Sequence, residues 1–213
     1  MIIVFDVDGT LLDTYPVVRQ TYIDIFDHYL PTVAYDEALL ASFFGPPLYD
    51  TFYQLVNNVD QANVLVQRYR QQTKINNPQY LKVFPGAKEC IETLSRKGFI
   101  LGVLSNKIKE AIIDGFDFVG FPNRFDLILG YEDLKHPKPD PEGLLKMKAM
   151  FHDEVVMVGD SIYDMEVARR AGSESIGVTW GNTSRTQLCD AGATWIASSF
   201  EELLQILSSY SPL

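Results

Sequence analysis

The stretch Ile2-Ile3-Val4-Phe5-Asp6-Val7-Asp8-Gly9-Thr10 joins an apolar run to two aspartates spaced two residues apart. Residues 2–5 are apolar and mostly β-branched, a pattern typical of a strand buried inside a parallel sheet. The two carboxylates that follow repel each other unless a cation or a chemical task compensates them. The stretch therefore predicts the first strand of an α/β sheet and a functional site at its carboxyl end.

Similar apolar runs recur along the chain and alternate with helical patterns. The expected strands occupy residues 2–5, 100–104, 127–129, 155–158, 175–179 and, more weakly, 194–197. The expected helices of this part occupy residues 87–97, 141–151, 162–171 and 200–207. This alternation predicts an α/β fold with a Rossmann-like, doubly wound and mostly parallel sheet.

The segment 14–81 breaks the alternation. It contains helix-like stretches at 16–29, 36–43, 48–57 and 61–74 and no convincing strand. A connection of this length is a structured insert and not a loop. We expect two domains: an α/β core made of residues 1–13 and 82–213, and a helical insert at 14–81.

Composition restricts the classes of partner. The 213 residues are 46% hydrophobic and carry a net charge of −10, which disfavours nucleic acid and anionic membranes as main partners. The two cysteines lie far apart without metal-ligand neighbours, no apolar run is long enough to span a membrane, and no basic region precedes the first apolar run. We expect a cytoplasmic monomer or homodimer that binds a small molecule.

Polar residues follow each of the first four strands of the predicted core. In open α/β sheets, ligands bind beyond the carboxyl ends of the strands, so these residues should meet at one edge. In chain order they are Asp6, Asp8, Gly9 and Thr10; then Ser105, Asn106 and Lys107; then Lys138; and finally Asp160 and Asp164.

A cluster of carboxylates stays ionised only if a cation compensates it, and Mg²⁺ prefers such oxygen ligands. We expect Asp6 and Asp160 as direct ligands, Asp8 through its backbone carbonyl, and Asp164 either directly or through a water. The turn at Gly9 and Thr10, the hydroxyl of Ser105 and the ammonium of Lys138 are candidate phosphate-binding groups. This equipment indicates phosphoryl transfer. A helix-capping role for Ser105 and a helix-terminal charge at Asp164 remain alternatives.

Four stretches together resemble the haloacid dehalogenase superfamily of phosphotransferases. They are residues 6–10, 104–106, 136–139 and 159–164, in the order that the family has. The resemblance covers the whole chain and implies that the helical insert is an α-helical cap. It also implies that Asp6 forms an aspartyl-phosphate and that Asp8 protonates the leaving oxygen and then activates water. Ser105 and Lys138 would hold the phosphoryl group with help from Asn106, and Asp160 and Asp164 would complete the Mg²⁺ site.

The segment Phe44-Gly45-Pro46-Pro47-Leu48 resembles the substrate-facing loop of phosphoglycolate phosphatase-like enzymes. With Gly45 and Pro46, Arg19 is a candidate for substrate selection. The resemblance favours a phosphatase for a small phosphomonoester, with 2-phosphoglycolate as the first choice. Alternatives are a pyrophosphatase or 5′-nucleotidase of the same subfamily, a β-phosphoglucomutase-like isomerase, and a binding or regulatory module without turnover.

Overall fold

In the computed structural model, which describes residues 1–211, the chain forms two compact units. One unit contains residues 1–13 and the described residues from 83 onward, and the other contains residues 14–82. The boundary at 82/83 lies one residue from the one expected. That the second unit acts as a cap stays a prediction.

A six-stranded sheet with the order β5-β4-β1-β6-β7-β8 forms the first unit. All its strand pairs are parallel. The strands are β1 (Ile2–Phe5), β4 (Ile100–Leu104), β5 (Leu127–Leu129), β6 (Val155–Gly159), β7 (Glu174–Val178) and β8 (Trp195–Ala197). The predicted α/β class with a mostly parallel sheet is confirmed.

Strand β1 lies at the centre of the sheet, where Ile2 pairs with Ile100 of β4 and with Val155 of β6. Its four residues are fully buried, as their continuous apolar character predicts. The register brings the carboxyl ends of β1, β4 and β6 to one edge, so the residues that follow these strands lie close together.

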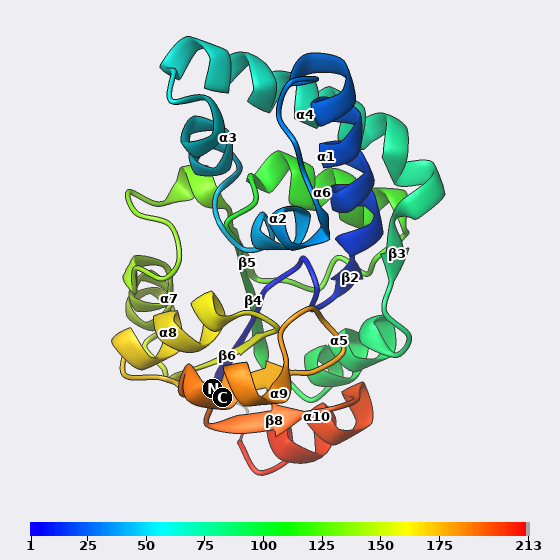
Figure 1. Cartoon of the computed structure of the whole chain (residues 1–213). Helices are drawn as coiled ribbons and strands as arrows, with labels where there is room; N and C mark the ends of the chain where they lie inside the picture. Colours follow the sequence, from blue (N-terminus) through cyan, green and yellow to red (C-terminus); the bar gives the residue numbers. More distant parts are fainter. Residues whose placement is uncertain (212–213) are drawn as a thin grey trace. The chain divides into compact units, whose positions relative to one another are not determined.

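Helices cover both faces of this sheet. Helices α7 (Glu142–Phe151) and α8 (Ile162–Arg170) pack with Ile2, Val4 and Met157 in one buried cluster. Figure 1 shows α5 (Ala87–Arg96) and α10 (Phe200–Leu207) on the other side of the strands, where they contact each other. The doubly wound arrangement follows, because side chains alternate between the two faces of each strand.

Three further elements complete this unit: α6 (Lys109–Phe118), the short 3₁₀ helix η1 (Tyr131–Asp133) and α9 (Arg185–Asp190). None of them was expected from the sequence pattern. Helix α7 begins at Glu142, one residue later than predicted, although Asp140 still accepts a hydrogen bond from the Glu142 N–H at 3.0 Å. Helix boundaries commonly shift by this amount.

The second unit is helical, as predicted for residues 14–81. It contains α1 (Tyr15–Tyr29), α2 (Glu37–Ser42), α3 (Leu48–Val56) and α4 (Val59–Tyr80), and α1 packs along α4. A cluster that includes Tyr22, Phe52 and Tyr69 fills its core. Helix α4 continues well past the predicted end at residue 74.

Two short strands, β2 (Leu12–Asp13) and β3 (Lys82–Val83), pair where the chain passes from one unit to the other. Sequence analysis expected no strands in this region. Within residues 1–211, no helix combines the length and the apolar character needed to cross a membrane.

Candidate active site

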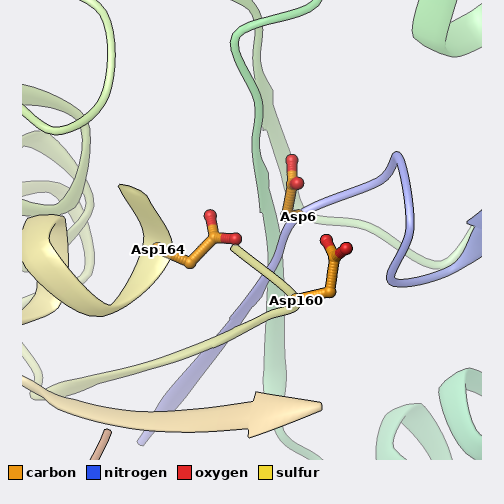
Figure 2. Close-up of side chains that lie close together, drawn as sticks. All are labelled: Asp6, Asp160 and Asp164. Atoms are coloured by element: carbon orange, nitrogen blue, oxygen red, sulfur yellow. The ribbon is translucent and has the colours of Figure 1, made fainter. Parts of the chain in front are cut away.

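Three buried aspartates converge at the carboxyl edge of the central strands. Asp6 follows β1, Asp160 follows β6, and Asp164 lies in the first turn of α8 (Figure 2). One carboxylate oxygen from each lies within 4.8 Å of the others. The sequence expected these residues to meet, and the parallel pairing of β1 with β6 explains why they do.

Local hydrogen bonds fix Asp164. Its Oδ2 accepts hydrogen bonds from the backbone N–H and the hydroxyl of Ser161 at 3.0 and 2.6 Å, which closes a capping box at the start of α8. Its Oδ1 accepts a hydrogen bond from Lys138 Nζ at 2.6 Å. Asp164 therefore caps α8 and contacts the buried ammonium, and its role at a metal site, direct or through a water, stays a prediction.

Asp6 differs from Asp164 because no donor reaches its Oδ1 in hydrogen-bond geometry within residues 1–211. This oxygen lies 3.0 Å from Lys138 Nζ in an ion pair. Burial raises the pKa of Asp6 to about 6, against the opposing effect of Lys138, and the carboxylates of Asp164 and Asp8 raise it further. A buried carboxylate oxygen without a donor is suited to a cation or to nucleophilic attack.

Asp160 lies against the turn that follows β1. Its Oδ1 accepts a hydrogen bond from Thr10 Oγ1 at 3.3 Å, and its Oδ2 accepts one from the backbone N–H of Asn182 at 3.1 Å. Burial raises its pKa well above the ordinary range, and the negative charges of Asp164 and Asp6 add to this effect.

Gly9 allows the close approach between this turn and Asp160. Its φ is +76°, and a Cβ at this position would lie 2.3 Å from Asp160 Oδ2. Its N–H donates to Leu12 O at 2.9 Å, and the N–H of Thr10 donates to Val7 O at 3.2 Å. These N–H groups thus form hydrogen bonds inside the turn, Thr10 also holds Asp160, and the expected role of Gly9 and Thr10 in phosphate binding stays a prediction.

Lys138 is the buried cation of the site, with 3% of its side chain exposed. Its ammonium lies between Asp6 and Asp164, at 3.0 and 2.6 Å. Burial alone would lower its pKa, but the two carboxylates outweigh that effect and the pKa is raised. Lys138 therefore remains charged at the centre of the acidic cluster.

Asn106 holds the backbone of Lys138 from both sides. Its Oδ1 accepts a hydrogen bond from the Lys138 N–H at 2.8 Å, and its Nδ2 donates to the Lys138 carbonyl at 3.2 Å. These two bonds hold the Lys138 loop, and the expected role of Asn106 in phosphate binding stays a prediction. The neighbouring Ser105 is 3% exposed, and its Oγ accepts a hydrogen bond from the Lys107 N–H at 3.3 Å.

Asp8 points its carboxylate toward a second cation. Its Oδ1 accepts a hydrogen bond from Lys107 Nζ at 2.8 Å. Asp8 is absent from the group of three aspartates whose oxygens converge, which agrees with the expectation that its carboxyl performs a different task from that of Asp6. The sequence placed Lys107 at this edge but assigned it no role.

Sequence analysis also missed two contacts from the loop after β7. The N–H of Asn182 holds Asp160, and Trp180 Nε1 donates to the carbonyl of Thr10 at 2.9 Å. The sequence position of Trp180 and Asn182 could have indicated this role, because their loop also follows a strand at the carboxyl edge of the sheet.

The predicted selectivity residues Arg19, Gly45 and Pro46 belong to the helical unit. Arg19 forms a two-pronged ion pair with Glu37, in which its Nε donates to Oε2 at 2.8 Å and its Nη2 contacts Oε1. Gly45 has a φ of +98° and lies, with Pro46, between α2 and α3. Their proposed role in substrate selection stays a prediction.

The acidic cluster fits a divalent cation. Three buried carboxylates face one buried ammonium, so negative charge exceeds positive charge. The groups are oxygen donors of the kind that Mg²⁺ prefers, and one oxygen of each carboxylate lies within 4.8 Å of the others. Asp6 and Asp160 would hold the ion, and Asp164 would support it.

Comparison with known proteins identifies the family. A sequence model of haloacid dehalogenase-like hydrolases matches residues 3–178. The chain is 30% identical over 207 residues to the pyrophosphatase PpaX of Bacillus velezensis, covering 96% of this chain and 94% of that protein.

Solved structures agree with the sequence match. A haloacid dehalogenase-like hydrolase from Bacteroides fragilis superposes with a TM-score of 0.85 at 26% identity, over 95% of this chain and 98% of that one. A predicted phosphoglycolate phosphatase from Haemophilus somnus shares the fold with a TM-score of 0.86 at 22% identity, over 96% of each chain. The chain belongs to the family of haloacid dehalogenase-like hydrolases, the family that its four motifs resemble.

Proposed function

We propose that this protein is a Mg²⁺-dependent phosphatase that hydrolyses a small phosphorylated metabolite through a covalent intermediate on Asp6. The observation that carries the proposal is the buried Asp6 carboxylate, whose Oδ1 lies 3.0 Å from the buried Lys138 ammonium and which lies close to the carboxylates of Asp160 and Asp164. A restrained carboxylate next to a fixed cation is equipped to attack the phosphorus of an anionic phosphoryl group.

The reaction has two balanced steps. In the first, an oxygen of Asp6 bonds to phosphorus, the bond from phosphorus to the leaving oxygen breaks, and Asp8 gives its proton to that oxygen. In the second, Asp8 takes a proton from water, and the water oxygen bonds to phosphorus. The bond between phosphorus and Asp6 then breaks, which releases inorganic phosphate and restores both aspartates.

The surrounding residues orient the phosphoryl group. Lys138 neutralises negative charge and restrains Asp6, Asn106 fixes the Lys138 loop, and Ser105 supplies a hydroxyl. When bound between Asp6 and Asp160, Mg²⁺ would add Lewis-acid stabilisation of the phosphoryl oxygens. We further propose that the helical segment 14–81 serves as a cap that excludes water during the reaction.

Two compounds are the leading candidate substrates for this site. The likeness of residues 44–48 to the loop of phosphoglycolate phosphatase-like enzymes favours 2-phosphoglycolate. The relative named as a pyrophosphatase, 30% identical over almost the whole chain, favours pyrophosphate as the second candidate. Both are small anions that a cytoplasmic enzyme of this kind would meet.

The test is phosphate release by the purified protein from 2-phosphoglycolate, pyrophosphate, nucleoside monophosphates, sugar phosphates and p-nitrophenyl phosphate. We expect Mg²⁺-dependent release that EDTA abolishes and that Asp6→Asn lowers by at least about 1,000-fold, because the nucleophile is lost. Asp190→Asn, which changes an exposed aspartate at the end of α9, serves as the control with unchanged activity.

The same assay separates the alternatives. An isomerase would convert β-glucose 1-phosphate to its isomer with little free phosphate. Absence of both activities over the whole panel would contradict the phosphatase proposal and leave the binding or regulatory module. Release that persists in Asp6→Asn would exclude Asp6 as the nucleophile.

A further inference from the structure

We propose that Lys107 binds an anionic leaving group, so that the substrate carries a second negative group beyond the phosphoryl group that is transferred. The inference rests on the proposed function, because it takes Asp8 as the residue that protonates the leaving oxygen. It assigns a specificity-determining role within the core unit, separate from the residues of the helical unit.

The site contains two lysines at different depths. Lys138 is 3% exposed, and its ammonium is shared between Asp6 and Asp164. Lys107 is 22% exposed and pairs with Asp8, whose side chain is 27% exposed. The first cation is thus committed to the buried acidic cluster, whereas the second lies where that cluster meets solvent.

The backbone of Lys107 is held in place beside β1. Its N–H donates to Ser105 Oγ at 3.3 Å, and its carbonyl accepts a hydrogen bond from the Tyr131 N–H at 3.0 Å. From this position Nζ donates to Asp8 Oδ1 at 2.8 Å. An ammonium carries three N–H groups, so it can hold Asp8 and bind a ligand oxygen at the same time.

The chemistry of Asp8 places the leaving group next to this ammonium. A proton donor must lie within about 2.6–3.2 Å of the oxygen that it protonates. Atoms two or three bonds beyond that oxygen then come within reach of Lys107, whose Nζ lies 2.8 Å from Asp8 Oδ1. A carboxylate or phosphate there forms an ion pair as well as a hydrogen bond with the ammonium, whereas a neutral amide forms the hydrogen bond without the ion pair.

The ion pair between Lys107 and Asp8 is partly exposed to solvent on both sides. Water screens such a pair and limits its contribution to stability. Substitution of Lys107 should therefore leave the protein folded, and its effect should appear in the choice of substrate.

The experiment compares 2-phosphoglycolate with its neutral carboxamide, which has the same leaving oxygen without the charge. We expect the wild type to prefer the anion in kcat/KM. Lys107→Gln should lower kcat/KM for the anion by about 10–100-fold and for the amide by less than about threefold. Lys107→Arg should keep most of the preference, because it retains the positive charge.

Lys146→Gln is the matched control. Lys146 also pairs with a carboxylate at 2.8 Å, that of Glu142 on the same helix α7, and its loss changes the net charge equally. It should leave the ratio of the two kcat/KM values unchanged.

Two results would overturn the assignment. One is a wild type that does not prefer the anion. The other is an equal loss of kcat/KM for both compounds in Lys107→Gln, which would make Lys107 a positioning residue for Asp8 alone.

If the wild type turns over neither compound, calorimetry decides. The substitution Lys107→Gln, introduced into the variant Asp6→Asn, should weaken the binding of pyrophosphate in the presence of Mg²⁺ about tenfold. An unchanged Kd would refute the inference. Failure of the proposed function is recognised separately, by lack of Asp6-dependent phosphate release from p-nitrophenyl phosphate.

Discussion

Asp160 shows how a single side chain can be unfavourable for folding and useful for function. Burial, followed by the charges of Asp164 and Asp6, raises its pKa well above the ordinary range. A raised carboxyl pKa means that the folded protein keeps a proton that the unfolded chain has lost. Without metal, the free energy of unfolding therefore falls as the pH rises from about 4 through the folded-state pKa.

Because the free energy of unfolding falls as the pH rises, we predict that Asp160→Asn stabilises the metal-free protein. At a pH of about 8 the gain should be roughly 1–3 kcal/mol, because the amide avoids burial of a charge. The advantage should shrink toward a pH of about 4, where the carboxyl is protonated. Added Mg²⁺ should raise the Tm of the wild type and have little effect on the variant, which lacks a ligand.

Thermal unfolding followed by circular dichroism, with EDTA or Mg²⁺, measures both effects. In the control Asp190→Asn, the Mg²⁺-induced rise in Tm should equal that of the wild type. A variant that is less stable than the wild type in EDTA, or that keeps the full Mg²⁺ effect, would contradict the assignment of Asp160 as a buried metal ligand.

Sequence reasoning identified most of the residues that converge at the site but not all of their partners. Asp6, Asp160 and Lys138 were recognisable because each follows an apolar run at the same edge of the predicted sheet. The bond from Lys107 to Asp8 and the two bonds from Asn106 to Lys138 depend on side-chain directions. The sequence pattern does not specify these directions.

Close packing links helix α7 to the end of strand β4. A Cβ on Gly143 would lie 2.5 Å from Leu104 Cδ1. Leu104 is the last residue of β4 and directly precedes Ser105. The position of this helix is therefore coupled to the loop that carries Ser105, Asn106 and Lys107.

We predict that Gly143→Ala destabilises the protein by about 1–3 kcal/mol, as overpacking of a dense core usually does. It should also lower kcat, because a shift of Leu104 passes to Ser105, its neighbour in the chain. Urea denaturation and steady-state kinetics measure the two effects. The double variant Leu104→Ala with Gly143→Ala tests the cause. Its loss of unfolding free energy should be smaller than the sum of the two single losses, because the side chain that the new Cβ would meet is gone. Strictly additive losses would rule out the contact between residues 143 and 104 as the cause.

Two of the differences between the predicted and the observed elements have a physical reason. The six residues of α9 give too little periodicity to detect a helix. Helix α4 extends to Tyr80 despite Pro78, and within it the Asn76 amide donates to Thr21 and Asp24 of α1 at 3.1 and 2.8 Å. These bonds stabilise the last turns of a helix that local sequence preference alone would end earlier.

At the scale of the whole molecule, the chain combines two units, and the candidate metal site lies in one of them. All three clustered aspartates belong to the α/β unit, and so do both tryptophans, Trp180 and Trp195. Tryptophan fluorescence therefore reports on that unit, whereas circular dichroism reports on the helices of both.

We predict that saturating Mg²⁺ separates the two signals during urea unfolding. A ligand stabilises the unit that binds it, so the fluorescence transition should move to higher urea. Part of the circular dichroism change should stay at its metal-free midpoint, because residues 14–82 contribute no ligand. In Asp160→Asn, added Mg²⁺ should leave the urea midpoints of both transitions at their metal-free values. Transitions that coincide and shift together would show instead that the two units unfold as one.

The sequence by itself determined the α/β class, the helical insert, the family and the set of residues at the carboxyl edge of the sheet. Periodicity and strand-end chemistry are local properties that can be counted along the chain. The tertiary structure decided which side chains bind one another: Asn106 with the Lys138 backbone, Asn182 with Asp160, and Lys107 with Asp8. The physical reason is that a hydrogen bond depends on distances and angles between residues far apart in the chain, and only the folded packing sets these.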